Sequence, residues 1–264
     1  MGLVLMAFLA LAGSATAAAG PAPVLRVGME TRAAPWAFVP GLDYSRENFR
    51  EPPRTTPAQV ARLQGFDVDV MNALAGRLGA RMEVVPVSWF DIEKGLLAGR
   101  YDLILSSWTP TQRTPPAIAS VPYCDWGLLI VVRSENATIR SYRDLEGVRV
   151  GHFPDPAVSR ALTAMGHGRF MAKDAPELLF EDLERGALDA VIYDSLYVRW
   201  RVGWDGRVKV VGEPLNRLGY YVGLRKEDPL LLRNVEEAVK DLVSSGERDR
   251  IRARWEGPGA PGPR

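Results

Sequence analysis

The 264-residue sequence contains little cysteine and little histidine. It has one cysteine, Cys124, and two histidines, His152 and His167. A single cysteine excludes an intramolecular disulfide and a paired-cysteine zinc site. Two histidines so far apart in sequence do not suggest a ligand set, and a satisfied or solvated side chain is the simpler interpretation of each. We therefore expect no metal and no cofactor.

The sequence motifs of common enzymes are absent as well. There is no Gly-x-Ser-x-Gly, no Walker-type phosphate loop and no His-Glu-x-x-His. The charge is almost balanced, with 33 basic and 32 acidic residues, so no broad basic surface for nucleic acid or for a membrane is indicated. These absences disfavour common hydrolases, zinc enzymes and nucleic-acid-binding proteins.

No apolar run reaches the roughly 20 residues of an ordinary transmembrane helix. The run from Leu3 to Ala12 is shorter, and the small residues from Gly13 to Gly20 follow it. This pattern fits a secretory signal and its cleavage site, although no Lys or Arg precedes the run. We expect residues 1–20 to be a signal peptide. Because no cysteine follows them, we expect a soluble periplasmic protein without a lipid anchor.

Short β-type runs alternate with helical patterns along the rest of the chain, which is typical of βα units and a parallel sheet. The first series predicts strands at 24–29, 81–87 and 102–105 and helices at 67–78 and 91–98. The second predicts strands at 126–132, 148–151 and 190–193 and helices at 157–165, 176–185 and from Asp194. A strand at 220–224 and helices at 230–243 and 247–255 complete the chain.

Two such series predict an α/β protein with two lobes joined by two crossovers, near residues 131–134 and 217–221. The expected parts are lobe 1 from residues 24–130 plus 219–256, lobe 2 from residues 131–218, and a disordered Gly/Pro-rich tail at 257–264. Residues 40–63 are longer than an ordinary βα loop, so we expect either a functional lid or a mobile insert there.

A polar segment, Ser106 to Arg113, follows one of the predicted strands. Ligands in open α/β sheets bind beyond the carboxyl ends of strands, and an arginine such as Arg113 can hold a carboxylate through two parallel hydrogen bonds. The alternative for Arg113 is an exposed surface residue. Asp67 and Asp69 could suggest a metal pair, but Asp67 suits a helix N-cap and Asp69 suits the first turn, so we expect structural roles.

Several motifs together resemble those of the family 3 extracellular solute-binding proteins, the polar-amino-acid receptors of ABC importers. They occur in the family's order over about residues 24–256, and they are Leu25-Arg26-Val27-Gly28, Gly65-Phe66-Asp67-Val68-Asp69, Tyr101-Asp102-Leu103-Ile104, Val121-Pro122-Tyr123, Tyr142-Arg143-Asp144-Leu145-Glu146-Gly147, Gly186-Ala187-Leu188-Asp189-Ala190-Val191 and Val210-Val211-Gly212-Glu213-Pro214-Leu215. The resemblance implies the two-lobed type II periplasmic-binding-protein fold, in which each lobe is a mainly parallel sheet flanked by helices. It further implies a monomer that closes on a small polar ligand, an amino acid or a related solute, and delivers it to an ABC permease.

Carried over by position, the resemblance also implies ligand contacts. Arg113 would bind the α-carboxylate, Asp194 the α-ammonium, and Ser107 and Thr109 the same backbone-like groups; Glu30 would meet a side-chain cation, and Trp89 and Trp36 would stack on the ligand unless they belong to the core. The family's Gly-Thr-Thr loop is replaced here by Phe153-Pro154-Asp155-Pro156-Ala157. The two prolines remove amide donors, and Asp155, which we expect among the ligand-binding residues, adds a negative charge near a helix N-terminus that would otherwise receive an anion.

Two alternatives remain open on the same fold. The altered loop and the insert at 40–63 would also suit a periplasmic accessory or sensory protein that signals to a partner protein. A cyclohexadienyl dehydratase would share the motifs but would need an acid or base in the cleft, for which Glu30 and Asp155 are the candidates.

Overall fold

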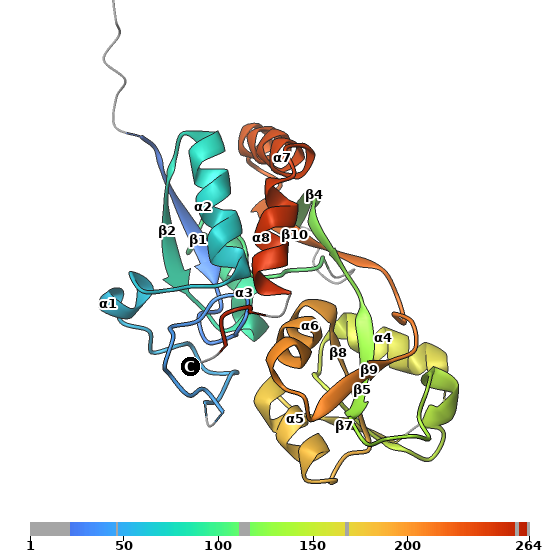
Figure 1. Cartoon of the computed structure of the whole chain (residues 1–264). Coiled ribbons are helices and arrows are strands. Elements are labelled where there is room, and N and C mark those ends of the chain that lie inside the picture. Colours follow the sequence, from blue (N-terminus) through green and yellow to red (C-terminus); the bar gives the residue numbers. More distant parts are fainter. Residues whose placement is uncertain (1–21, 46, 111–116, 167–168, 257–258, 263–264) are drawn as a thin grey trace, which may run out of the picture.

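The computed structural model describes residues 22–45, 47–110, 117–166, 169–256 and 259–262, and its strands form two five-stranded sheets (Figure 1). The first sheet has the order β2-β1-β3-β10-β4, formed by β1 (Val24–Met29), β2 (Arg81–Pro86), β3 (Leu103–Ile104), β4 (Ala117–Trp126) and β10 (Leu218–Arg225). The second has the order β7-β6-β8-β5-β9, formed by β5 (Leu128–Arg133), β6 (Arg149–His152), β7 (Arg169–Ala172), β8 (Ala190–Asp194) and β9 (Val208–Val211). One strand in each sheet is antiparallel to both of its neighbours: β10 in the first sheet and β5 in the second. The other described strands of each sheet run parallel to one another. The predicted pair of mainly parallel sheets is confirmed.

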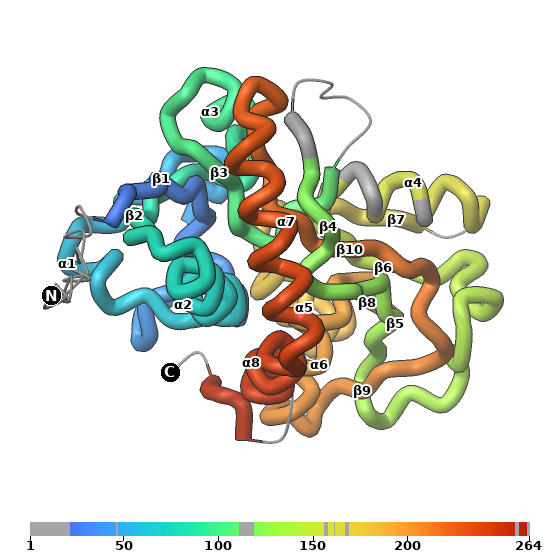
Figure 2. Tube along the Cα trace, turned by 90° about the horizontal axis from the view of Figure 1, so that it is seen from above, coloured from blue at the N-terminus to red at the C-terminus, as the bar shows by residue number. Residues whose placement is uncertain are grey.

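Helices flank both sheets. Around the first sheet lie α1 (Pro57–Val60), α2 (Phe66–Leu78), the 3-10 turn η1 (Trp89–Asp91), α3 (Ile92–Leu97), α7 (Pro229–Ser244) and α8 (Glu247–Trp255); around the second lie η2 (Tyr142–Leu145), α4 (Pro156–Met165), α5 (Pro176–Glu184) and α6 (Ser195–Trp204). Figure 2 shows α7 crossing over the first lobe, where it packs on β4 and α2. The end of the chain therefore completes the first lobe. Within the described residues, no helix has the length and apolar character needed to span a membrane.

The sequence of helix α2 explains both its buried face and the place where it begins. Its buried face is apolar and includes Val70, Met71 and Leu74, at the three- and four-residue spacing of a helix. Gly65 directly precedes the helix; its φ is 144°, and a Cβ added to it would lie 2.0 Å from the carbonyl oxygen of Trp36. Only glycine fits so close an approach. The start of α2 is thereby fixed against the turn that carries Trp36.

The predicted lobe boundaries need correction at both crossovers. All of β5 pairs with β8 and β9, so the second lobe begins at Leu128 and not at residue 131. The return crossover lies between β9 and β10, ahead of the predicted 217–221, because β10 already pairs with β4 at Leu218. The apolar run from Trp126 looked like one strand, but Gly127 divides it. A Cβ on Gly127 would lie 2.5 Å from the carbonyl oxygen of Asn216, so the two crossing segments touch there.

Part of the predicted disordered tail is ordered against the second lobe. The indole Nε1 of Trp200 in α6 donates a hydrogen bond of 2.7 Å to the carbonyl oxygen of Pro261. A buried indole N–H is normally hydrogen-bonded, and this bond fixes Pro261 of the tail against α6. The predicted signal peptide at 1–20 lies outside the described residues.

Candidate functional site

A cavity of about 100 Å³ lies between the two lobes. Its walls come from both lobes and comprise Glu30, Ala33, Trp36, Phe49, Trp89, Ser106, Ser107, Thr109 and Trp126 on one side and Leu128, Phe153, Asp155, Val158, Pro176, Tyr193 and Asp194 on the other. The residues predicted as ligand contacts that the structure describes, namely Glu30, Trp36, Trp89, Ser107, Thr109, Asp155 and Asp194, all line this cavity. Arg113 lies outside the described residues.

The sheet topology explains why these side chains meet. Glu30 directly follows β1 and Ser106 follows β3, two parallel neighbours in the first sheet. Phe153 follows β6 and Asp194 ends β8, two parallel neighbours in the second. The carboxyl ends of parallel strands meet at one edge of a sheet, which is where open α/β folds bind ligands. The two edges face each other across the cavity.

Glu30 is held in a buried ion pair. Its Oε1 accepts from Nε of Arg32 at 2.9 Å and its Oε2 from Nη2 at 2.9 Å, and both side chains are 3% exposed. The backbone N–H of Arg32 and that of Trp89 also donate to this carboxylate. A bidentate guanidinium neutralises the charge that was predicted to meet a ligand cation. Glu30 lines the cavity, but its negative charge is already compensated.

Ser107 is positioned by Asp67 from the start of α2. Its φ is +48°, in the left-handed region that residues other than glycine rarely adopt. Its Oγ donates to Oδ2 of Asp67 at 2.8 Å, and the hydroxyl of Tyr123 donates to Oδ1 at 2.8 Å. Burial raises the pKa of Asp67 to about 7, against the lowering effect of these two bonds. Asp67 is thus not the N-cap that the sequence predicted: Gly65 precedes the helix, and Asp67 turns inward.

Asp69 points to a different part of the lobe. Its Oδ2 accepts from the indole Nε1 of Trp255 at 2.9 Å. Among the described residues no group of three His, Cys, Asp or Glu side chains could hold a metal ion. Asp69 thus contacts Trp255 from the first turn of α2, whereas Asp67 does not cap the helix as predicted.

Asp194 lies in the second-lobe wall of the cavity, at the end of β8. Its Oδ1 accepts from the backbone N–H of Leu196 at 2.7 Å, which caps α6, and its Oδ2 accepts from the hydroxyl of Tyr220 in the first sheet. Burial raises the pKa of Asp194 to about 7, although both hydrogen bonds favour the charged form. A buried carboxylate of this kind is stabilised by an adjacent cation. Asp194 therefore offers a place for a positive group on a ligand.

Asp155 caps the helix that follows the altered loop. Its Oδ1 accepts from the backbone N–H of Val158 at 3.1 Å in the first turn of α4. A free helix N-terminus attracts anions, but here a carboxylate of the chain itself occupies it. The N-terminus of α4 therefore already holds a carboxylate, in contrast to the anion-binding loop that the resemblance would otherwise imply.

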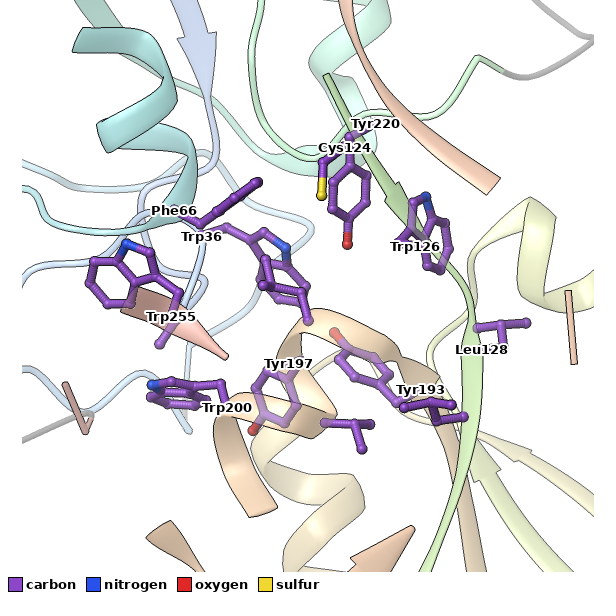
Figure 3. Close-up of a cluster of buried hydrophobic side chains, with 14 of the residues drawn as sticks. Trp36, Phe66, Cys124, Trp126, Leu128, Tyr193, Tyr197, Trp200, Tyr220 and Trp255 are labelled. Atoms are coloured by element: carbon purple, nitrogen blue, oxygen red, sulfur yellow. The ribbon is translucent and has the colours of Figure 1, made fainter. Parts of the chain in front are cut away.

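Aromatic rings from both lobes contact one another around the cavity. Trp36 stacks on Tyr197 with ring centroids 5.9 Å apart and meets Tyr193 edge to face at 6.3 Å. Figure 3 shows these three rings in one buried cluster. Trp89 meets Phe153 edge to face at 6.0 Å. Trp36 is only 8% exposed, so it belongs both to the core and to the cavity wall. The ring contacts join the lobes directly.

Comparison with known proteins decides the family. The family model described as bacterial extracellular solute-binding proteins, family 3, matches residues 49–258. The chain belongs to this family. The family's description refers to extracellular solute binding, and the cavity between the two lobes is the candidate site for such a solute.

The individual relatives have low sequence identity but match half of this chain or more. The L-cystine-binding protein TcyJ of Escherichia coli (strain K12) is 27% identical over 210 residues, 78% of this chain and 79% of the relative. The structure of an Ancestral Cationic Amino Acid Solute Binding Protein has a TM-score of 0.71 and 27% identity and covers 88% of this chain and 95% of its own. The cyclohexadienyl dehydratase of Pseudomonas aeruginosa is 26% identical over 140 residues, 51% of this chain and 52% of the enzyme.

In this family 3 protein the insert at residues 40–63 lies across the cleft. Phe49 reaches the cavity wall. Arg50 forms a bidentate ion pair with Asp174 of the second lobe, at 2.8 and 3.0 Å, and stacks over the ring of Phe90 at 4.4 Å. Nη2 of Arg32 in the first lobe donates a hydrogen bond of 3.0 Å to the carbonyl oxygen of Glu51 in the insert. The insert is therefore a strap between the lobes, where the sequence left open either a functional lid or a mobile insert.

Replacing Asp174 with alanine should weaken ligand binding only slightly. Arg50 and Asp174 are about half exposed, at 55% and 43%, and surface ion pairs contribute about 0–1 kcal/mol. We expect a loss of affinity of no more than about fivefold, and a smaller loss at high salt because the pair is screened. Calorimetric titration at low and high salt measures both. A loss above tenfold in either buffer would contradict this role.

Sequence reasoning missed four aromatic residues of the wall, Phe49, Trp126, Phe153 and Tyr193. Tyr193 directly precedes Asp194 at a strand end, and Trp126 ends the strand before the crossover. Both positions could have been predicted to line the cleft, because ligands bind near strand ends in open α/β folds. Phe49 had none, because it lies in an insert without a repeating pattern.

Proposed function

We propose that the two lobes close on a compact amino acid or a close relative and present it to the permease of an ABC importer. The main support is that charged and aromatic side chains from both lobes line one small cavity. Contacts from two lobes form together only when the cleft is shut, so a ligand stabilises the closed arrangement. The names of the relatives, which refer to cystine and to cationic amino acids, support an amino acid as the ligand class.

Each end of a zwitterion has a counterpart in this proposal. Asp194 pairs with the α-ammonium, and Asp155 lines the same side of the cavity. Arg113 pairs with the α-carboxylate, as the resemblance implies. Ser107 and Thr109 carry hydroxyls in the first-lobe wall, and Trp89 covers the apolar part of the ligand. Glu30 orders the wall through Arg32 instead of binding a cation itself.

A thermal-shift screen of refolded protein tests the function. A ligand present at about a hundred times its dissociation constant adds roughly 2.7 kcal/mol to the free energy of unfolding. We expect an amino acid or an N-substituted amino acid to raise the melting temperature of the wild type, and Arg113→Ala to abolish that rise. If no common amino acid and none of their N-methylated forms raised the melting temperature, the proposal would be overturned and an accessory or sensory protein favoured.

Prephenate belongs in the same panel because half of the chain is similar to a cyclohexadienyl dehydratase. Binding without loss of prephenate over time would be compatible with a solute-binding protein. Consumption of prephenate that Asp155→Asn abolishes would instead assign the chain an enzymatic reaction.

A further inference from the structure

The carboxylate of Asp194 is contacted by both lobes. Its Oδ1 accepts from the backbone N–H of Leu196 at 2.7 Å in the second lobe, and its Oδ2 accepts from the hydroxyl of Tyr220 in β10, a strand of the first sheet. Asp194 itself pairs with Leu128, the first residue of the second lobe. The bond from Tyr220 therefore lies beside the crossover and joins the lobes where the chain passes from one to the other.

The ring of Tyr220 is held in place by the first lobe. It is 1% exposed, stacks on Trp126 with ring centroids 5.4 Å apart and planes at 17°, and meets Tyr123 at 6.0 Å. Trp126 in turn donates from Nε1 to the hydroxyl of Thr109 at 3.1 Å, and both of these residues line the cavity. Figure 3 shows the hydroxyl of Tyr220 directed toward the side where Tyr193 of the second lobe lies. The donor is thus fixed by residues of the first-lobe wall.

The hydroxyl of Tyr220 affects the charge of Asp194 as well as its position. Burial raises the pKa of Asp194 to about 7, and the bond from Tyr220 opposes that rise because a donor stabilises the charged carboxylate. Burial also raises the pKa of Tyr220 well above its usual value, so the hydroxyl keeps its proton and remains a donor. The other titratable groups that face this pair are Glu256 and its partner Arg252 from α8 and its end, Cys124 from β4, and Tyr193 from β8.

We propose that Tyr220 is a positioning residue through which the first lobe orients the carboxylate of Asp194 and holds it in the charged form. Because donor and acceptor belong to different lobes, a change in the angle between the lobes changes this bond. Tyr220 lies outside the cavity wall, so it acts on the ligand through Asp194. This inference rests on the proposed function, in which Asp194 receives the cation of the ligand.

Titration of the ligand-free protein tests this role directly. In full-length mature protein that is isotope-labelled on its aspartate carboxyl carbons, the nuclear magnetic resonance signal of Asp194 is assigned by its loss in Asp194→Asn. We expect its midpoint near pH 7 in the wild type and at least about half a pH unit higher in Tyr220→Phe, which keeps the ring but removes the donor. Coinciding midpoints in the two folded proteins would overturn the inference.

Ligand affinity gives a second readout. Well above pH 7, calorimetric titration with a ligand from the thermal screen should show a loss of at least about tenfold in Tyr220→Phe, because hydrogen bonds to charged groups are the stronger ones. On the Asp194→Asn background the same substitution should change the affinity less than about threefold, because the charged acceptor is already gone. Equal losses on both backgrounds would contradict a role through Asp194.

Tyr101→Phe is the matched control for a buried tyrosine of the first lobe. Tyr101 is fully buried, but its hydroxyl donates to the backbone carbonyl oxygen of Ile92, and it lies outside the cavity wall. We expect this variant to lose some stability and to keep both the wild-type affinity and the midpoint of Asp194. A loss of affinity as large as in Tyr220→Phe would show that a general loosening of the first lobe explains the effect, and the positioning role would fail.

The same measurements distinguish failure of this inference from failure of the proposed function. If the midpoint rises in Tyr220→Phe but no amino acid binds the wild type, the proposed function fails while Tyr220 still sets the charge of Asp194. If an amino acid binds the wild type and the midpoints coincide, the positioning role alone fails.

Discussion

Replacing Asp194 with asparagine is expected to weaken ligand binding roughly 100-fold, because removing one partner of a buried charge pair costs about 2–5 kcal/mol. The asparagine oxygen can still accept from the N–H of Leu196, so the cap of α6 is retained. Calorimetric titration of a ligand found in the thermal screen measures the loss. The variant tests whether the cavity recognises a cation through this carboxylate.

The same carboxylate predicts how binding depends on pH. Burial raises the pKa of Asp194 to about 7, so its charge is present above that pH and is lost as the pH falls below it. A ligand cation favours the charged form. Affinity should therefore be constant above pH 7 and fall up to about tenfold for each pH unit below it. In Asp194→Asn this contribution to the slope should be absent.

Asp182→Asn is the matched control for a buried aspartate. Asp182 is 8% exposed, pairs with Lys173 at 2.9 Å, and lies outside the cavity wall. We expect this variant to lose stability but to keep both the wild-type affinity and its pH dependence. An Asp194→Asn protein that binds as tightly as the wild type would show that Asp194 only caps its helix.

The positions of the site residues could be predicted better than their partners. Asp194 ends one strand and Ser107 follows another, and the order of the strands brings such residues together at the cleft. The partner of Ser107 could not be predicted in the same way. Asp67 is 40 residues away, and it lies just after Gly65, which packs against the backbone of Trp36 at the start of α2.

The crossovers show a related limit. The apolar pattern on both sides of Gly127 predicted one strand, although a glycine inside such a run often marks a bulge or a close approach of another backbone segment. The break becomes visible only through Asn216, whose side chain accepts from the N–H of Leu128 at 2.9 Å. Such a contact depends on the return of the chain about ninety residues later, which no local pattern contains.

The largest effect on stability is expected for Arg32→Ala. The substitution leaves the carboxylate of Glu30 buried without its partner, and breaking a buried pair from one side costs about 3–5 kcal/mol. It also removes the donor to the carbonyl oxygens of Asn48 and Glu51, at 3.2 and 3.0 Å, which hold the strap. For a chain of this size each kcal/mol shifts the melting temperature by about 2–4 °C. Thermal unfolding should therefore show a decrease of about 6–20 °C.

Two further variants make this prediction specific to the buried pair. Arg26→Ala removes an arginine that pairs with Asp102 at 2.8 Å but is 45% exposed, so we expect a loss of at most about 1 kcal/mol. Glu30→Gln combined with Arg32→Ala removes the uncompensated charge and should recover part of the stability. The strap should nevertheless remain more sensitive to trypsin in that double variant, because its carbonyl contacts with Arg32 are still missing. Equal melting temperatures for Arg32→Ala and the wild type would mean that neither the strap nor the first-lobe wall depends on the Glu30–Arg32 pair.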